Sequence, residues 1–449
     1  ADIEDVYKRI LRNLLGLPEA TLADIPRGTV VVAEDLYPSD TAGMDPRAVV
    51  AMVTQAGGPT SHASILAKNL GIPAAVQVAG ILDSVDTNEP IVVENREGGE
   101  ARVIVDPDPA TSRSARERAA RLEARRTELA RYRGAEARTT DGVLVTLSAN
   151  IGSTEELDPA REAGARSVGL YRSEFLFLGT PTLPDEERQY AAYRAAAEHF
   201  PEGFVIFRTL DIGGDKTLPA LPLPEEDNPF LGNRALRICL NRPELFGAQL
   251  RAMLRASAHG KAKIMFPMVG GVEELDEALT ALQEARDALD ATGVAYDREL
   301  EVGIMTEVPS AVLAADALAR RVDFFSVGTN DLTQYLLAAD RLNPAVAKYY
   351  RSFDPSLFAA IRMVVEAAER QGRWVGVCGE LGGNPLAIPL LLGLGVTELS
   401  MSPRMLDEAT AIVSRGRMEE FRTLADSVVQ LDSHTEIEAL LNNYYNQKE

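Results

Sequence analysis

Apolar and polar positions follow four different patterns along the chain. Residues 3–18 repeat apolar side chains at helical spacing, and Gly16 and Pro18 then end the pattern. From residue 28 to about residue 106, short β-rich runs separated by turn residues take over, at 29–33, 48–54, 90–94 and 101–105. These patterns predict one helix followed by a compact α/β domain of about 90 residues.

Residues 111–134 are rich in Ala, Arg, Glu and Leu, and their only large apolar side chains are Leu122, Leu129 and Tyr132. A helix with so thin an apolar stripe is typical of a connection between domains. Gly134 ends the pattern. We therefore expect an interdomain helix and hinge here.

From residue 140 onward, apolar strand candidates alternate with amphipathic helical segments. The candidates lie at 143–148, 167–171, 204–208, 263–268, 302–306, 323–327, 374–378 and 398–402. Strands so apolar, separated by helices, imply a parallel sheet covered by helices. Eight such units over about 300 residues favour a closed (β/α)8 barrel of the TIM type, with an open doubly wound sheet as the lesser alternative.

Composition limits the classes of function. The 449 residues carry 46 basic and 67 acidic side chains, a net charge of −21, which argues against nucleic acid or an anionic membrane as partner. The only cysteines, Cys239 and Cys378, exclude a disulfide scaffold. The sequence has no apolar run of about 18 residues and no secretory signal pattern. We expect a cytoplasmic protein without a membrane span.

Charged side chains and a thiol follow the ends of the predicted strands, where a barrel of this type carries its active residues. They are Arg172, Arg208, Lys216, Glu307, Asn330, Asp331 and Cys378. Any one of them could be a mere cap, and a lone cysteine is usually a small core residue. Several at one barrel end indicate an active site, in which Cys378 would donate or accept a proton.

The residue types at these strand ends suggest a substrate. Glu307 and Asp331 suit Mg²⁺, which one or two carboxylates usually hold together with substrate phosphate oxygens. Arg172, Arg208 and Arg341 offer forked donors for phosphate and carboxylate oxygens. Arg341 stands ten residues beyond Asp331, and we expect the intervening helix to carry it away. The implied substrate is small and bears both a phosphate and a carboxylate.

His62 is one of four histidines and lies in "GGPTSHASILAKNLGIP", residues 57–73. Thr60 or Ser61 is a good N-cap, so the histidine would open a helix. Unpaired N–H groups at that end favour a neutral imidazole and a bound anion, as phosphorylation of a nucleophilic histidine requires. The alternative is a histidine that only caps or packs at a helix start.

Several stretches together resemble one family. The histidine segment "GGPTSHASILAKNLGIPA" is followed in order by "GLYRSEFLF", "FRTLDIGGDK", "NPFLGNRALR", "MTEVPSA", "DFFSVGTNDLTQYLLAADR" and "GVCGELGGNP". This set resembles the phosphoenolpyruvate-utilising enzymes, most closely enzyme I of the bacterial sugar phosphotransferase system. The resemblance covers nearly the whole chain.

The resemblance implies a set of roles. His62 would take the phosphoryl group of phosphoenolpyruvate on Nε2 and pass it to the carrier protein HPr. Glu307 and Asp331 would hold Mg²⁺. The remaining roles are substrate binding by Arg172, Arg208, Asn330, Asp331 and Arg341, with Lys216 and Arg234 as further contacts, and protonation of the enolate by Cys378 to give pyruvate.

The resemblance also implies the domain plan and the assembly. Residues 1–18 would be a helix left from the N-terminal HPr-binding domain, most of which is missing, and 19–108 the phosphohistidine domain. A linker helix at 109–138 would join it to the phosphoenolpyruvate-binding barrel and dimerisation domain at 139–449. We expect a homodimer through the barrel, phosphorylation of His62, and inefficient delivery to HPr.

Two other functions are compatible with parts of this pattern. A fragment of a pyruvate phosphate dikinase or phosphoenolpyruvate synthase would share the histidine and barrel but needs an ATP-binding domain, and no glycine-rich loop of that kind is present. A regulator that binds phosphoenolpyruvate without turnover should lack the proton donor or a metal carboxylate. Cys378, Glu307 and Asp331 are all present.

Overall fold

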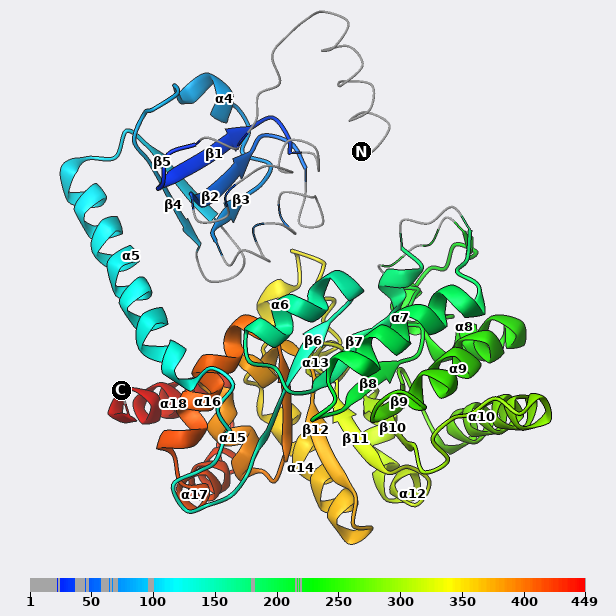
Figure 1. The fold of residues 1–449 in the computed structure, drawn as a ribbon. Coiled ribbons are helices and arrows are strands. Elements are labelled where there is room, and N and C mark those ends of the chain that lie inside the picture. The colour runs from blue at the N-terminus through cyan, green and yellow to red at the C-terminus, as the bar shows by residue number, and fades with distance from the viewer. Residues whose placement is uncertain are drawn as a thin grey trace, which may run out of the picture. The chain divides into compact units, whose positions relative to one another are not determined.

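The computed structural model describes residues 22, 25–36, 45, 48–57, 64, 67, 72–95, 101–178, 182–214, 216, 218 and 220–448. It divides into two compact units, Ala1–Glu128 and Leu129–Glu449 (Figure 1). The helix predicted at residues 3–18 lies outside the described residues.

The first unit contains two small sheets. Strands β1 (Thr29–Ala33), β2 (Val49–Thr54) and β3 (Ala74–Ala75) form a parallel sheet in that order, while β4 (Ile91–Asn95) pairs antiparallel with β5 (Ala101–Val105). The short helix α4 (Ile81–Ser84) follows β3. Val31 and Met52 belong to one apolar cluster and Val53 to another, so both faces of the valine-rich sheet are covered. This arrangement confirms the smaller α/β unit.

Helix α5 (Pro109–Leu129) and the 3-10 turn η3 (Ala130–Tyr132) follow the second sheet. Leu129 is the only buried residue of α5, as its thin apolar stripe predicts. The helix crosses the boundary between the two units.

The second unit is a closed barrel of eight parallel strands (Figure 1). The strands are β6 (Thr146–Ile151), β7 (Val168–Arg172), β8 (Val205–Arg208), β9 (Ala262–Phe266), β10 (Glu301–Thr306), β11 (Phe324–Val327), β12 (Trp374–Val377) and β13 (Glu398–Met401). Pairing of β13 with β6, Glu398 opposite Thr146, closes the ring. The (β/α)8 barrel is confirmed, and the open sheet is excluded.

Helices surround the strands (Figure 1). They are α6 (Leu157–Glu162), α7 (Glu186–His199), α8 (Leu236–Leu240), α9 (Pro243–Ser257), α10 (Val272–Thr292), α11 (Pro309–Leu313), α12 (Ala315–Ala319), α13 (Thr329–Leu337), α14 (Pro355–Arg370), α15 (Ala387–Gly393), α16 (Leu406–Arg415), α17 (Met418–Val428) and α18 (His434–Lys448). Local sequence sets their limits: Asp185 caps α7 by accepting from the backbone N–H of Arg188, and Gly293 ends α10 in the left-handed region.

The barrel has an outer core between strands and helices and a smaller inner core. Leu170, Ile206, Met265, Met305, Phe324 and Cys378 form the inner cluster. Among the described residues, no helix is both long and apolar enough to cross a bilayer.

Candidate active site

The C-terminal ends of the barrel strands meet at one end of the barrel, which we call the mouth. Arg172 ends β7 and Arg208 ends β8, and these two residues are direct partners in the ladder. Glu307 follows the end of β10, Asp331 lies in the first turn of α13 after β11, and Cys378 follows the end of β12. Because all eight strands run parallel, side chains far apart in sequence reach the same mouth.

Arg208 and Lys216 share two buried carboxylates. Arg208 donates to Glu174 at 2.6 Å and lies 3.1 Å from Asp211, while Lys216 Nζ lies 2.9 Å from Glu174 and 3.0 Å from Asp211. Burial opposes ionisation of Glu174, but the charges of Arg208 and Lys216 outweigh it and lower its pKa. The four side chains therefore form a fixed network of charges.

Arg234 extends that network to α13. Its guanidinium is buried and donates to Asp331 through both Nη1, at 3.0 Å, and Nη2, at 3.3 Å, while Nε reaches Asp211 at 3.3 Å. Tyr335 Oη accepts a further bond from Nη1 at 3.4 Å. A buried guanidinium held by two carboxylates has little freedom, so its direction is fixed before any ligand arrives.

Arg341 does reach the site. Helix α13 ends at Leu337, and Ala338 adopts the left-handed conformation, so the chain reverses. The backbone N–H of Arg341 donates to Gln334 Oε1 at 3.0 Å, and Nη2 lies 3.9 Å from Asp331 Oδ1. The expectation that a helix would carry Arg341 away was wrong because the helix is shorter than its apolar pattern suggested.

Glu307 and Asp331 are two acids that repel each other, and of the two only Asp331 has an ion pair with an arginine. Glu307 is buried, and its Oε1 accepts from the backbone N–H of Met268 at 2.7 Å. Burial, and then repulsion from Asp331 and Asp211, raises the pKa of Glu307 to about 8. No cluster of three or more histidine, cysteine, aspartate or glutamate side chains suited to a metal exists among the described residues. Two close carboxylates fit Mg²⁺, which completes its shell with water and substrate oxygens.

Asn330 ties α13 to the segment after β12. Its Oδ1 accepts from the backbone N–H of Glu380 at 3.1 Å, and its carbonyl accepts from Tyr350 Oη at 3.2 Å. Gly379 packs so tightly there that a Cβ would overlap the Thr329 side chain. These contacts fix the loop that carries Cys378.

Cys378 is a buried thiol at the inner end of the site. Its Sγ lies 3.8 Å from the carbonyl oxygen of Val327, and burial raises its pKa to about 12. The group is therefore a protonated thiol at neutral pH. A protonated thiol at this position is suited to give a proton rather than to act as a resting nucleophile.

Arg172 differs from the other cations. Its buried Nε has no hydrogen-bond partner, and no ion pair joins it to any described residue. Its guanidinium lies 5.8 Å from the centroid of the Phe175 ring. Within the described part of the chain, Arg172 is thus a mouth cation that can take an anion without losing a carboxylate partner.

Comparisons with known proteins agree with this geometry. Residues 126–418 match the model of the PEP-binding domain of PEP-utilising enzymes, and residues 25–98 match that of their mobile domain. A phosphoenolpyruvate-protein phosphotransferase of Geobacillus stearothermophilus is 44% identical over 97% of this chain and 75% of its own length. Those of Staphylococcus carnosus and Bacillus subtilis are 43% and 41% identical, each over 99% of this chain, covering 77% and 78% of their own lengths.

The chain belongs to the phosphoenolpyruvate-protein phosphotransferase family. The match includes both units, so the motifs in the first unit and those in the barrel belong to one kind of enzyme.

The family's predicted nucleophile, His62, lies outside the described residues. Of the helix that the sequence predicts there, only Ser64 and Ala67 are described, and both are helical.

Sequence reasoning missed the acidic partners of the mouth cations. Glu174 and Asp211 are buried and anchor Arg208 and Lys216, yet neither was among the predicted site residues of this phosphotransferase. A signal was present, since each acid stands two or three positions after a strand-end arginine. The acids were overlooked because the search followed groups able to touch an anionic substrate.

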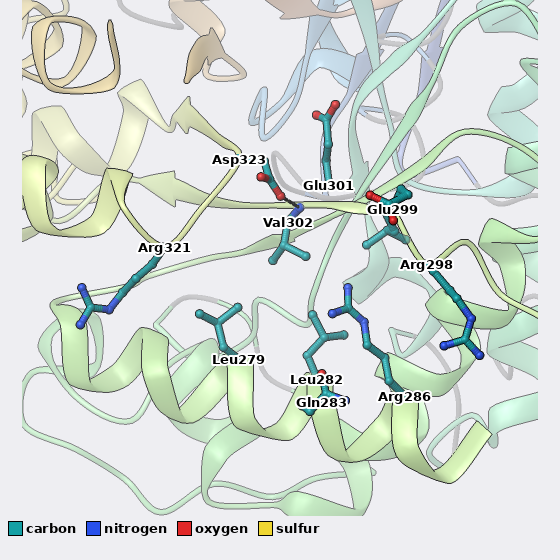
Figure 2. A pocket seen from close by; sticks show the side chains of 11 residues that line it. Leu279, Leu282, Gln283, Arg286, Arg298, Glu299, Glu301, Val302, Arg321 and Asp323 are labelled. Carbon is teal, nitrogen blue, oxygen red and sulfur yellow. Dashed lines mark hydrogen bonds between the residues drawn. The ribbon is translucent and has the colours of Figure 1, made fainter. Parts of the chain in front are cut away.

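A separate cavity of about 420 Å³ lies at the opposite end of β10 from the mouth (Figure 2). It is lined by Leu279, Leu282 and Arg286 of α10 and by Glu301 and Val302, which begin β10. Figure 2 shows Val302 on the side of the α10 leucines and Glu301 on the other side of the strand. None of the predicted site residues of the phosphotransferase lines this cavity.

Proposed function

We propose that the chain transfers the phosphoryl group of phosphoenolpyruvate to His62, in a reaction that requires Mg²⁺ and releases pyruvate. One observation carries the proposal. Five cationic side chains and four carboxylates converge at the mouth above one protonated thiol: Arg172, Arg208, Lys216, Arg234 and Arg341 with Glu174, Asp211, Glu307 and Asp331. A small substrate with a phosphate and a carboxylate matches that arrangement.

Substrate binding uses the cations in two ways. Arg172 takes an anionic group directly, since no described carboxylate competes for it. Arg208 and Arg234, held by buried acids, supply fixed positive charge where phosphoryl oxygens gather charge in the transition state. Lys216, Asn330 and Arg341 complete the contacts around the substrate.

Mg²⁺ would be held by Glu307 and Asp331, and it would supply Lewis-acid neutralisation of the phosphoryl oxygens. In the metal-free protein, proton uptake by Glu307 relieves the repulsion between the two acids instead.

The reaction forms one bond and breaks one. The N–P bond to His62 forms as the P–O bond to the enol oxygen breaks, which leaves the enolate of pyruvate. Cys378 then donates its thiol proton to C3 of the enolate, giving pyruvate and a thiolate. Protonation at carbon makes the phosphoryl transfer harder to reverse.

We propose the same domain plan and partners as the resemblance implies. The domain at 19–108 carries His62, the segment at 109–138 links it to the barrel at 139–449, and the barrel forms a homodimer in the cytoplasm. The phosphoryl group then passes from His62 to HPr in sugar uptake. Purified HPr tests this second step separately.

The first step is tested with phosphorus-labelled phosphoenolpyruvate and Mg²⁺. We expect an acid-labile, alkali-stable phosphoprotein, as phosphohistidine requires, and no label in His62→Ala. His259→Ala is the matched control and should keep the label, because His259 follows α9 and bonds to Tyr190 of α7 on the outside of the barrel. Label that persists in His62→Ala contradicts the assignment of the nucleophile.

A further inference from the structure

Glu398 on β13 is a buried acid with no evident partner. Its side chain is 2% exposed, and neither carboxyl oxygen has a hydrogen bond from any described protein group. It lies in the barrel wall and is absent from the site built above. A buried polar group without partners costs several kcal/mol when charged, so its presence calls for a physical reason.

Two glycines leave space for this carboxyl group inside the barrel. A Cβ at Gly169 of β7 would overlap Oε1, and a Cβ at Gly376 of β12 would overlap Oε2. Glu398 therefore points into the barrel interior, toward Gly376 of the neighbouring strand β12 and Gly169 of β7, the second strand on its other side. Burial raises its pKa to about 8, partly offset by Ser148 and by the charge of Lys263. Glu398 is thus a neutral carboxylic acid at pH 7.

The carboxyl and the thiol of Cys378 lie in consecutive side-chain layers of the barrel interior. Gly376 pairs in register with Glu398, and Cys378 stands two positions further along β12. Side chains two apart on a strand share one face and are separated by about 6.6 Å. Beyond burial, the negative charge of an ionised Glu398 also raises the pKa of Cys378, so the two groups are near enough to interact.

Hydroxyl groups border the space between the acid and the thiol. Ser148 and Ser326 have buried oxygens without hydrogen-bond partners in the described part of the chain. Ser326 pairs in register with Gly376. Ser400, two residues beyond Glu398, bonds to Asn150, whose Nδ2 donates to the carbonyl of Cys378 at 3.0 Å. Barrel interiors are normally filled by branched apolar side chains, so this polar lining is unusual.

The other end of the interior, which we call the floor, consists of Phe204, Lys263, Glu301, Phe324 and Trp374. Lys263 Nζ lies 4.8 Å from the centroids of the Phe204 and Trp374 rings and pairs with Glu301. The Glu301 side chain is 42% exposed, so solvent reaches the floor. Lys263 and Cys378 are the titratable groups that act on Glu398 from β9 and β12, while β6, β7 and β11 contribute Ser148, Gly169 and Ser326.

We propose that Glu398 resupplies the proton that Cys378 gives to the enolate. The thiolate left by that step takes a proton, through the hydroxyl lining, from the Glu398 carboxyl group. The resulting carboxylate takes a proton from solvent at the floor. Each step moves one proton, and the net change is transfer of one solvent proton to C3. This rests on the proposed function, because it assumes that Cys378 is the proton donor.

The test compares two exchange reactions in D₂O with Mg²⁺, phosphoenolpyruvate and carbon-labelled pyruvate. Carbon exchange between pyruvate and phosphoenolpyruvate needs only one proton, which Cys378 gives to C3 in the forward step and takes back in the reverse step. Deuterium enters C3 only if Cys378 exchanges its proton with solvent. We expect Glu398→Gln to lower the ratio of deuterium incorporation to carbon exchange at least about ten-fold. This is less than the factor of about 100 or more by which a positioned acid or base usually speeds a proton transfer.

Glu299→Gln is the matched control. Glu299 lines the Figure 2 cavity but precedes β10 and is exposed, so its variant should keep the wild-type ratio. Thermal unfolding of each variant checks the fold. A purely structural role for Glu398 would lower both exchanges together and leave the ratio unchanged, which overturns the proposal.

The wild-type protein gives a second test that needs no variant. Its ratio should fall as the pH rises through about 8, where Glu398 loses its proton, and a ratio that stays flat from pH 6 to pH 10 overturns the proposal. Absence of carbon exchange in the wild type would instead be a failure of the proposed function.

Discussion

The mouth of the barrel and the interior below it both bury acidic groups, but they neutralise them differently. At the mouth, Glu174 and Asp211 are paired with Arg208, Lys216 and Arg234 at distances near 3 Å. In the interior, Glu398 has no such partner among the described residues and is neutralised by a proton. One region holds permanent charges, and the other holds an exchangeable proton.

The difference fits what each region would do. Phosphoryl transfer needs charges already in place, because reorienting them during the reaction would add to the barrier. Protonation at carbon needs a group that can lose and regain a proton, which a carboxylate locked to an arginine cannot do at neutral pH. The barrel separates the two requirements along its axis.

The largest effect should come from Arg234. Arg234→Met leaves Asp331 without its buried partner and removes one of the three cations around Asp211, and we expect a loss of about 3–5 kcal/mol in the free energy of unfolding. The matched variant Arg172→Met removes a cation without a described ion pair, and we expect it to cost less than about 1 kcal/mol. Both should bind phosphoenolpyruvate more weakly. Denaturant unfolding and substrate titration measure the two effects, and equal stability losses would remove the distinction between paired and unpaired cations.

A smaller, pH-dependent effect should come from Glu398. The carboxyl has a folded-state pKa of about 8 and an ordinary value of 4.5, so between these limits the folded protein keeps a proton that the unfolded chain has lost. Stability of the wild type therefore falls as the pH rises through that window, by up to about 1.4 kcal/mol per unit from this group. Glutamine is neutral throughout.

Glu398→Gln should accordingly differ little from the wild type at pH 5 and be more stable by a few kcal/mol at pH 8.5. Chemical denaturation at the two pH values measures the difference in free energy of unfolding between the variant and the wild type. Contributions from other groups such as Glu307 are the same in both proteins and cancel. The same difference at both pH values would mean that Glu398 is ionised in the folded protein.

Much of the barrel could be predicted from local pattern. All eight strand candidates correspond to strands β6–β13, and the first is displaced by three residues because the apolar run begins before the ladder does. Parallel strands buried on both faces leave a strong signal in sequence. The two-residue strand β3 left none, since an Ala-Ala pair has no strand pattern of its own.

The site was predictable as a set of substrate-facing groups and less so as a network. Strand-end position identified Arg172, Arg208, Glu307, Asp331 and Cys378, but it cannot tell which acid neutralises which cation. That depends on three-dimensional proximity, as for Arg234 and Asp331, which are 97 residues apart. Glu398 escaped notice because it begins a strand, and only the glycines on β7 and β12 reveal the space that it occupies.

If phosphoryl transfer and carbon protonation occur at one mouth, above one thiol, a single turnover should link the two products. The measurement uses labelled phosphoenolpyruvate and quantifies phosphorylated His62 and released pyruvate in the same samples. The wild type should form the two products together. In Cys378→Ala the label should still reach His62 while pyruvate lags at least about 100-fold, as loss of a general acid implies. Pyruvate formed by Cys378→Ala at the wild-type rate would contradict the account.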